Sequence, residues 1–487
     1  MTEPAKPSRL SKTIFVAIAR FVAAASGLLI AVVLSKTLPT ELEYATYRQT
    51  LLTFQFVAPL LGLGLTTAAL FFLPREPRRA GTIVLEMVLL LFLAGGLFAA
   101  VMLLGGAQWV AYRFNNPNLE TTLTWFSCYA IFALPVTLVG PVLVSREESL
   151  WVAGHSGAIG LLKIICVVGP VLLISKNSLL AVQGIMVWAI LAFLGSLFVF
   201  WLKLPKLTSG PSAESLKRIC GYGIPLSIAT VIATINRNVD KILVSDILSP
   251  EEAAVFMNGA IEIPFIGIVV GSVTSILAAE FSAKFEKGQV NEIMIVWQNA
   301  VKKTAAILLP IGAFLYAFAE PTMIVLFDER YIASSEPFQI YLYLLPLRVF
   351  QGGLFLQMAG KTRLLLAFSI IVTIFNAVLT YLLVPPIGMN GAAYATVLSV
   401  GLIGFPLGVG MTQYALGIKI HEWIPYRVIF SFLLISVGLF LFLKFVLGYF
   451  DLSPIWNLGL AGAAVPVLSW TMLRWCGINL FPRKLRE

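Results

Sequence analysis

Long apolar runs separated by short polar stretches fill the chain almost from end to end. A helix needs about 20 apolar residues to cross a hydrocarbon layer about 30 Å thick, and fourteen windows of that size can be drawn. Their apolar residues are continuous or follow a helical period, unlike the alternating ten-residue strands of an outer-membrane barrel. The pattern predicts an all-α polytopic membrane protein with about fourteen transmembrane helices. The predicted spans are 14–34, 44–73, 81–104, 120–143, 154–175, 179–201, 220–243, 252–280, 302–327, 337–359, 364–384, 391–416, 426–447 and 454–476.

The first apolar run follows three basic residues, as the core of a signal peptide would. It is about 21 residues long, which exceeds the length of a secretory signal core, and thirteen further runs follow it. We therefore expect it to be retained as the first transmembrane helix.

Composition supports the same fold class. Hydrophobic residues make up 59% of the chain and charged residues 12%, about half the charged share of soluble domains. A water-soluble core cannot absorb that excess, because its surface must be polar. The cysteines are scattered without a close pair, which argues against a disulfide framework or a metal cluster. They are Cys128, Cys166, Cys220 and Cys476.

Basic residues in the loops predict the orientation of the chain. With the N-terminus in the cytoplasm, 23 of the 34 lysines and arginines fall in cytoplasmic segments. The opposite loops hold only Lys36, Arg113, Lys176 and Arg330. We expect both termini to be cytoplasmic, and the formal charge of +10 is then a topology signal that gives no support to nucleic-acid binding.

A polar connection divides the chain. Residues 202–219 are rich in proline, serine and glycine, then basic, which suits a cytoplasmic linker with an amphipathic helix. The division predicts an N-terminal lobe over 1–201 with six spans and a C-terminal lobe over 220–416 with six more. Residues 417–487 would hold spans 13 and 14 and a basic C-terminal tail.

Two segments about 210 residues apart resemble each other. Residues 38–47 and 248–256 each contain a leucine, a turn with proline, acidic residues, a small residue and an aromatic one. Since six spans separate them, both repeats would enter the membrane from the same side. This predicts two lobes in parallel pseudo-symmetry, with a substrate path between them.

Motifs for enzyme chemistry are missing. His155 and His421 have no metal-spaced partner, and Gly360-Lys361-Thr362 lacks the earlier glycine of a phosphate-binding loop because Phe355 stands there. We expect a protein without catalytic residues or a metal site.

The informative residues are charges inside the predicted spans, where each costs a few kcal/mol and usually faces a cavity or a partner. Glu86 and Lys444 lie near enough to span ends to snorkel. Arg48 and Lys241 also lie near an end, so for them both interpretations stay open. The full set is Arg20, Arg48, Glu86, Lys163, Arg237, Asp240, Lys241, Glu262, Arg348 and Lys444.

The deepest charges are mostly positive. Arg237, Asp240 and Lys241 share one helix face and could pair locally, but that would leave Arg20 and Arg348 without an anion. The excess predicts a basic, water-filled cavity for an anionic substrate, because arginine binds phosphate oxygens bidentately. The predicted substrate-binding residues are Arg20, Arg48, Arg237, Lys241 and Arg348, and the residues for charge balance or coupling to H⁺ or Na⁺ are Asp240 and Glu262.

Several stretches resemble one known family. They are the turn at 38–47, Gly62 to Thr67, Asn236 to Leu243, Gly360 to Thr362 and Gly388 to Thr396. Together they are similar to the polysaccharide-transporter branch of the multidrug/oligosaccharidyl-lipid/polysaccharide exporter superfamily. The chain departs from the family where Ala45 and Ala254 replace the usual glycines of the two turns.

This resemblance implies a flippase of the bacterial inner membrane. Such a protein moves undecaprenyl-pyrophosphate-linked oligosaccharide from the cytoplasmic to the periplasmic leaflet by alternating access, as O-antigen flippases do in lipopolysaccharide synthesis. It implies membrane lipids as surroundings, and glycan polymerase and glycosyltransferase proteins as partners. No cofactor is expected apart from H⁺ or Na⁺ as a coupling ion.

Three other functions compete with the flippase. A cation-coupled drug or metabolite exporter of the same fold would favour an acidic, aromatic cavity, whereas the deep charges here are mainly basic. A membrane glycan ligase or polymerase would need a large outer loop, and the longest one here, near 105–119, holds only Arg113. A structural scaffold would leave the deep charges unexplained.

Overall fold

The computed structural model describes residues 9–207, 210–261, 290–350, 361–416, 424–450 and 452–477, with Leu356 and isolated residues between 266 and 281. These described residues form helices joined by short turns and contain no strand. The chain divides into two compact units. Unit 1 comprises Met1–Asn238 and Ser245–Ala254, and unit 2 comprises Val239–Val244 and Val255–Glu487.

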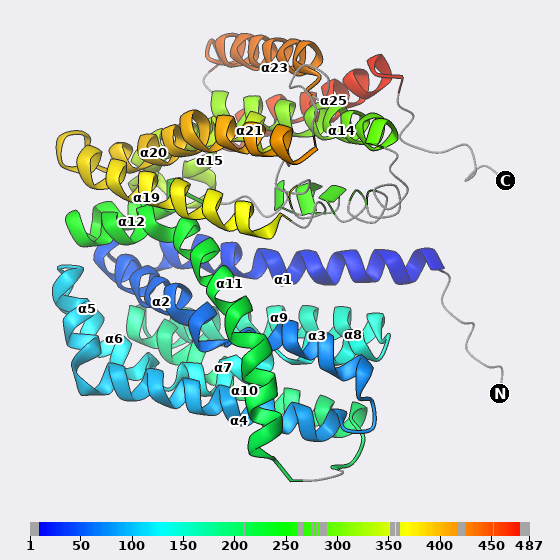
Figure 1. The fold of residues 1–487 in the computed structure, drawn as a ribbon. Coiled ribbons are helices and arrows are strands. Elements are labelled where there is room, and N and C mark those ends of the chain that lie inside the picture. The colour runs from blue at the N-terminus through cyan, green and yellow to red at the C-terminus, as the bar shows by residue number, and fades with distance from the viewer. Residues whose placement is uncertain are drawn as a thin grey trace, which may run out of the picture. The chain divides into compact units, whose positions relative to one another are not determined.

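Unit 1 holds the helices from α1 to most of α11 (Figure 1). A π-helical turn, η1, lies between α4 and α5. The bounds are α1 Arg9–Thr37, α2 Glu41–Leu61, α3 Leu65–Arg75, α4 Ala80–Val101, η1 Met102–Gly106, α5 Ala107–Arg113, α6 Asn118–Phe126, α7 Tyr129–Val136, α8 Val139–Ser145, α9 Ser149–Leu173, α10 Ser178–Lys203, α11 Ala213–Ile247 and, reaching into unit 2, α12 Pro250–Gly259.

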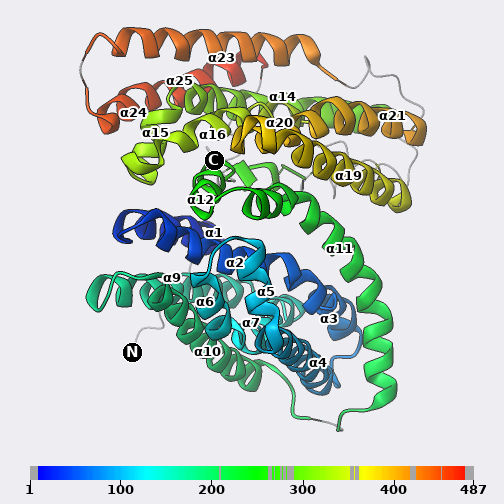
Figure 2. The same cartoon turned by 90° about the vertical axis from the view of Figure 1, so that its left-hand side faces the viewer.

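Unit 2 holds the remaining helices (Figure 2). Within it α19 and α20 form a hairpin, and α14 packs against α23 and α25. The bounds are α14 Val290–Ala317, α15 Ala319–Leu326, η2 Glu329–Ser334, α16 Ser335–Leu342, α17 Leu345–Arg348, α19 Thr362–Ile387, α20 Met389–Leu398, η3 Ser399–Gly404, α21 Phe405–Leu416, α23 Tyr426–Leu447, α24 Pro454–Gly462 and α25 Ala464–Trp475.

The predicted spans are observed as apolar helices. Among the described residues ten helices are long and apolar enough to cross a membrane, and a pair bent by 51°, Asn118–Phe126 and Tyr129–Ser145, makes an eleventh. The predicted span 14–34 lies within α1, where Phe21–Thr37 forms a shorter apolar helix. The predicted spans 252–280 and 337–359 each include residues outside the described set. The predicted all-α, polytopic fold class is confirmed.

The two similar turns form the same local structure. Thr40 caps α2 by accepting a hydrogen bond from the amide of Glu43 at 3.2 Å. Ser249 and Glu252 form a reciprocal capping box at the start of α12, with distances of 3.1 and 3.2 Å. In both turns a hydroxyl satisfies amides that would otherwise lack an acceptor.

Each unit also contains a hydrogen bond between a later turn and the helix that follows its similar turn. In unit 1 the Asn116 amide group donates to Thr46 at 3.0 Å and to Gln49 at 2.8 Å, and all three side chains are fully buried. In unit 2 the Ser334 hydroxyl donates to the carbonyl of Val255 at 2.8 Å. Each bond joins a turn that precedes a later helix to the first helix after one of the two similar turns.

The linker leads directly into α11, whose first turn is held by Glu86 of α4. The carboxylate accepts hydrogen bonds from the Ser212 amide at 3.1 Å and the Ser215 hydroxyl at 2.6 Å. An anion at a helix N-terminus is stabilised by the free amides and the helix dipole. Glu86 is fully buried, so the snorkelling interpretation was wrong for this residue: a second helix supplies its partners.

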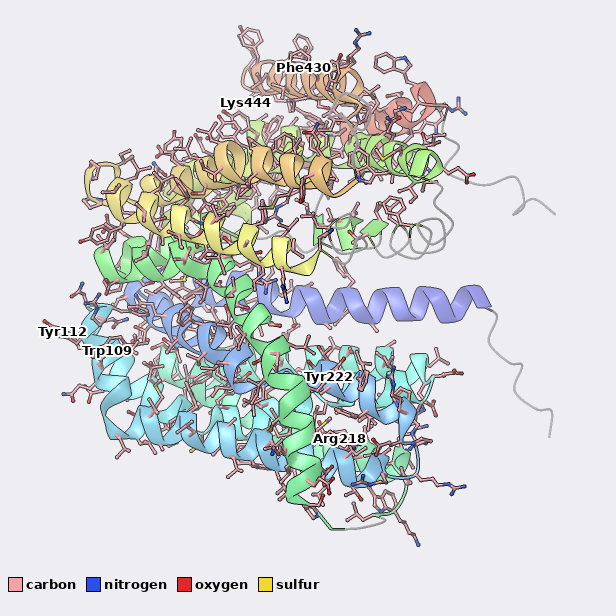
Figure 3. All side chains as sticks on the ribbon, viewed as in Figure 1. Trp109, Tyr112, Arg218, Tyr222, Phe430 and Lys444 are labelled. Carbon is pink, nitrogen blue, oxygen red and sulfur yellow. The ribbon has the colours of Figure 1, made fainter. Side chains whose placement is uncertain are left out.

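The following turns of α11 pack on α3 (Figure 3). Arg218 pairs with Glu76 at 2.8 Å, and the Tyr222 ring stacks on Phe71 at 4.4 Å. One turn further, α11 crosses the break between α2 and α3. A Cβ atom on Gly64 would lie 2.2 Å from the carbonyl oxygen of Gly223, so the two backbones touch.

We predict that Gly64→Ala destabilises the protein. Gly64 has a φ of 65°, which costs other residues about 1–2 kcal/mol, and the added methyl group would collide with the α11 backbone. The melting temperature in detergent should fall. Gly96→Ala is the matched control, because its Cβ meets nothing within 4 Å; equal melting temperatures for the two variants would contradict the close contact.

Candidate functional site

Asp240 lies at the centre of a buried polar cluster in unit 2. Its side chain is 3% exposed. One carboxylate oxygen accepts a hydrogen bond from the Lys241 amide at 2.7 Å. The other accepts from the Thr396 hydroxyl of α20 at 3.1 Å and from the Tyr341 hydroxyl of α16. Three helices therefore meet at one carboxylate.

A second layer on α19 supports these contacts. The Asn376 side-chain oxygen accepts from the Thr380 hydroxyl at 3.0 Å and lies 3.4 Å from the Thr396 hydroxyl oxygen. Asn376 and Thr380 are buried one helical turn apart. The Phe256 ring of α12 lies 6.2 Å from the Tyr341 ring. Asp240, Asn376, Thr380 and Thr396 are all buried, and burial strengthens the hydrogen bonds among them.

Asp240 does not pair with Arg237. The sequence spacing allowed that ion pair, but the carboxylate is turned toward the hydroxyl groups of α16 and α20. Arg237 is exposed and donates only to the Thr234 hydroxyl, at 3.4 Å. In the described part of the chain no carboxylate lies within ion-pair distance of its guanidinium.

Two other predicted residues belong to unit 2. Lys241 follows Asp240 on α11 and is half-buried. Arg348 ends α17 and is exposed. Lys241 contacts Asp240 through its backbone amide.

The remaining predicted residues lie elsewhere. Arg48 of α2, in unit 1, donates to the Tyr44 hydroxyl at 2.7 Å, and its guanidinium stands 5.6 Å from that ring. Arg20 is a residue of α1, and its side chain lies outside the described set. Glu262 also lies outside the described residues.

The Asp240 cluster has the chemistry of a cation site. Its carboxylate is buried among neutral donors and has no basic side chain paired with it in the described structure, so a proton or a small hard cation could neutralise it. Hard cations prefer oxygen ligands, and Asp240, Tyr341, Thr396 and Asn376 offer only oxygens. No group of three or more histidine, cysteine or acidic residues that could hold a metal ion occurs among the described residues.

Sequence reasoning missed the hydroxyl and amide members of this cluster. Asn376 and Thr380 stand four residues apart in an otherwise apolar stretch, and a polar pair on one helix face inside a membrane is a usable signal. Tyr341 and Thr396 gave no such signal, because single tyrosines and threonines are common in spans.

The fold is that of a known transporter superfamily. A solved structure of the lipid II flippase MurJ in an inward closed conformation matches 95% of this chain and 99% of its own, with a TM-score of 0.72 at 17% identity. An inward-facing multidrug resistance MATE family transporter matches 83% of this chain and 98% of its own, with a TM-score of 0.62 at 16% identity. A transporter from Pyrococcus furiosus gives a TM-score of 0.57 at 18% identity, over 83% of this chain and 95% of its own. The two latter proteins are described as members of the MOP superfamily, which is the exporter superfamily named above.

The chain is therefore a multi-pass membrane protein with the fold that these solved structures share. The family model described as polysaccharide biosynthesis protein matches residues 84–336, which is 253 of the 487 residues. The chain belongs to that family, and the resemblance drawn from its motifs is confirmed. None of the curated proteins matches this chain.

We predict that Thr396→Val destabilises the protein by about 1–3 kcal/mol, the usual cost of removing a partner from a buried polar group. Valine keeps the shape of threonine but removes the hydroxyl that donates to Asp240. Thermal unfolding in detergent measures the effect. Thr396→Ser keeps the hydroxyl and should recover most of the loss; if both variants melt with the wild type, the hydroxyl contributes nothing to the cluster.

Proposed function

We propose that this protein is a flippase for undecaprenyl-pyrophosphate-linked oligosaccharide. The observation that carries the proposal is that Arg237 has no acidic partner among the described residues. This arginine lies ten residues from the C-terminal end of α11, about 15 Å along the helix, and the nearby acid Asp240 is committed to other donors. A deep guanidinium without an acidic partner in the described structure suits a substrate that supplies the anion itself.

A pyrophosphate matches this requirement. It carries several charged oxygens that arginine can bind bidentately, and it cannot enter hydrocarbon without compensation. Family membership supports a role in polysaccharide synthesis, and the fold similarity to a lipid II flippase supports a lipid-linked substrate. We propose Arg20, Arg48, Arg237, Lys241 and Arg348 as contacts for the head group along a basic central cavity.

We further propose that the Asp240 cluster couples transport to a cation, H⁺ or Na⁺. Binding would require the carboxylate to exchange a hydroxyl donor for the cation, and Tyr341 and Thr396 belong to two other helices of unit 2. A change at one carboxylate would thus alter how three helices are held. Glu262 is a second candidate for charge balance.

The proposed function implies a location, an orientation and partner proteins. We propose that the protein resides in a bacterial inner membrane with both termini in the cytoplasm, and that it works beside glycan polymerase and glycosyltransferase proteins. The excess of basic residues in alternate loops supports the orientation.

The alternative is an exporter of drugs or metabolites, since a multidrug transporter shares the fold. That match leaves 17% of this chain without a counterpart, whereas the flippase match leaves 5%. A cationic drug would also be repelled by Arg237 and Arg348. Both points favour the flippase.

We expect purified protein in proteoliposomes to flip a fluorescent undecaprenyl-pyrophosphate oligosaccharide, and Arg20→Ala and Arg237→Ala to reduce the rate at least tenfold. Loss of a charge-assisted contact to phosphate is the physical reason. Arg427→Ala is the matched control, because Arg427 is exposed on α23 and stands over Tyr426.

A cationic dye tested in the same vesicles separates the two functions. Export of the dye without flipping of the lipid would establish the exporter and overturn the flippase. Loss of folding in the arginine variants, seen as a lower melting temperature, would mean that the arginines are structural.

We expect an imposed H⁺ or Na⁺ gradient to accelerate flipping by the wild type and not by Asp240→Asn. Asparagine keeps the shape of the side chain but removes the charge that a cation would neutralise. Glu214→Gln, at an exposed position in the first turn of the same helix, should respond like the wild type. A gradient response that survives in Asp240→Asn would place the coupling elsewhere.

A further inference from the structure

Helix α4 is long enough to cross the membrane, and it ends in a kink. Its 22 residues extend about 33 Å, which covers a hydrocarbon layer about 30 Å thick. The backbone then leaves helical geometry at Leu104, with φ −85° and ψ 17°, and at Gly105, with φ 115°. Figures 1 and 2 show that α5, which follows this kink, turns away from the direction of α4. Helix α5 therefore begins where α4 leaves the hydrocarbon.

Two contacts within unit 1 place α5 level with the ends of other helices. Arg113, the last residue of α5, forms an ion pair at 2.6 Å with Asp246, which is the second-last residue of α11. Asn116, just after α5, donates to Thr46 near the start of α2. Both neighbouring helices thus meet this segment at one end and not halfway along. Helix α5 therefore lies at one surface of the membrane.

One face of α5 is packed against the protein. Ala107, Val110 and Ala111 are buried in a cluster with Leu119 and Leu123 of α6. At about 100° of rotation per residue, the three buried positions of α5 occupy one arc of about 100° around the helix axis. The remaining arc has no such cover.

The uncovered face of α5 is aromatic at its centre. Trp109 and Tyr112 are 66% and 80% exposed (Figure 3), and they stand opposite the buried arc, about 60° apart around the axis. Gln108 and Arg113 flank them. A helix at the surface of a soluble protein carries polar residues at the centre of this face, so the face of α5 suits surroundings other than water.

The aromatic face continues an apolar stripe of α4. Leu93, Leu97, Val101 and Leu104 are 71%, 64%, 50% and 88% exposed, and their spacing of four, four and three residues puts them on one side of the helix. On a helix that crosses the membrane, such an exposed apolar stripe contacts lipid. The stripe ends at the kink, where α5 begins. The surface that meets lipid along α4 therefore leads directly to Trp109 and Tyr112.

We infer that α5 is an interfacial helix that binds the lipid surface, with the rings of Trp109 and Tyr112 at the level of the head groups. These two side chains suit that depth because each joins an apolar ring to a polar group. An interfacial helix buries its apolar face roughly 5–10 Å into the boundary between head groups and acyl chains. Arg113 is the only charged residue of α5 and is paired with Asp246, so neutral and anionic lipids should be bound alike.

The anchor also fixes the end of α11 at the membrane surface, because Arg113 holds Asp246 through two hydrogen bonds. Asp240 precedes Asp246 by six residues on the same helix and so lies about 9 Å further from this surface along the helix axis. The inference is independent of the substrate and stands whether or not the protein is a flippase.

The test measures the depth of nitroxide spin labels on Trp109→Cys and Tyr112→Cys, in full-length protein whose four native cysteines are replaced by alanine. In phosphatidylcholine vesicles, depth follows from the ratio of label collisions with oxygen, which dissolves in lipid, to collisions with a water-soluble nickel chelate. We expect both labels roughly 5–10 Å below the phosphates, at the same depth after phosphatidylglycerol is added. The matched controls are Leu97→Cys, on the exposed stripe of α4, which should lie deeper, and Lys176→Cys, exposed between α9 and α10, which should lie in water.

Three results would overturn the inference. Labels on α5 that meet the nickel chelate as often as the label at Lys176 would place the helix in water. Labels shielded from both reagents would mean that protein, such as a second copy of the chain, covers this face. Insertion only with phosphatidylglycerol would mean that charge and not the aromatic face binds the lipid.

A second measurement keeps the inference testable if a labelled variant melts below its cysteine-free parent. Trp109→Phe in the otherwise native chain removes one component of the tryptophan fluorescence. Lipids brominated near the head group should quench that component more than lipids brominated near the end of the acyl chain. The reverse order, or no quenching by either lipid, would contradict an interfacial position for Trp109.

Discussion

A charge inside hydrocarbon must be compensated, and the polar side chains of the spans are arranged around that requirement. Asp240 is satisfied by two hydroxyl groups and an amide. Glu86 is satisfied by the start of another helix. These two acids therefore form no ion pair with a basic residue in the described part of the chain.

Helix α11 carries both kinds of charge within one turn. Its beginning is fixed to unit 1 by Glu86, by the Arg218–Glu76 ion pair and by the backbone contact at Gly64. Near its other end Asp246 forms a two-pronged ion pair with Arg113 of α5, at 2.6 and 2.7 Å. Residues Val239–Val244 between these anchors belong to unit 2. The helix that bears Arg237 and Asp240 is therefore shared by both units.

The spans could be predicted from sequence because a backbone in lipid must satisfy its own hydrogen bonds, so long apolar runs become helices. The family could likewise be predicted from the sequence motifs. The hydrogen-bond and ion-pair partners of the side chains could not. The spacing of Arg237 and Asp240 permitted an ion pair. Instead, the Asp240 carboxylate accepts hydrogen bonds from the hydroxyl groups of Tyr341 and Thr396, which are 101 and 156 residues further along the chain. The position of Glu86 near a span end suggested snorkelling. The sequence pattern does not reveal that Ser212 and Ser215, at the start of α11, lie against its carboxylate. The identity of neighbours across helices is set by packing, which sequence periodicity does not encode.

We propose that the Asp240 carboxylate binds the coupling cation, and the most direct test of this proposal is the melting temperature of purified protein against Na⁺ at constant ionic strength and against pH. One of the two cations should stabilise the wild type, by about 1.4 kcal/mol at ten times its dissociation constant, and Asp240→Asn should lose that response. Identical dependence on both cations in the wild type and in Asp240→Asn would contradict the claim, and the buried carboxylate would then be a structural link between α11, α16 and α20.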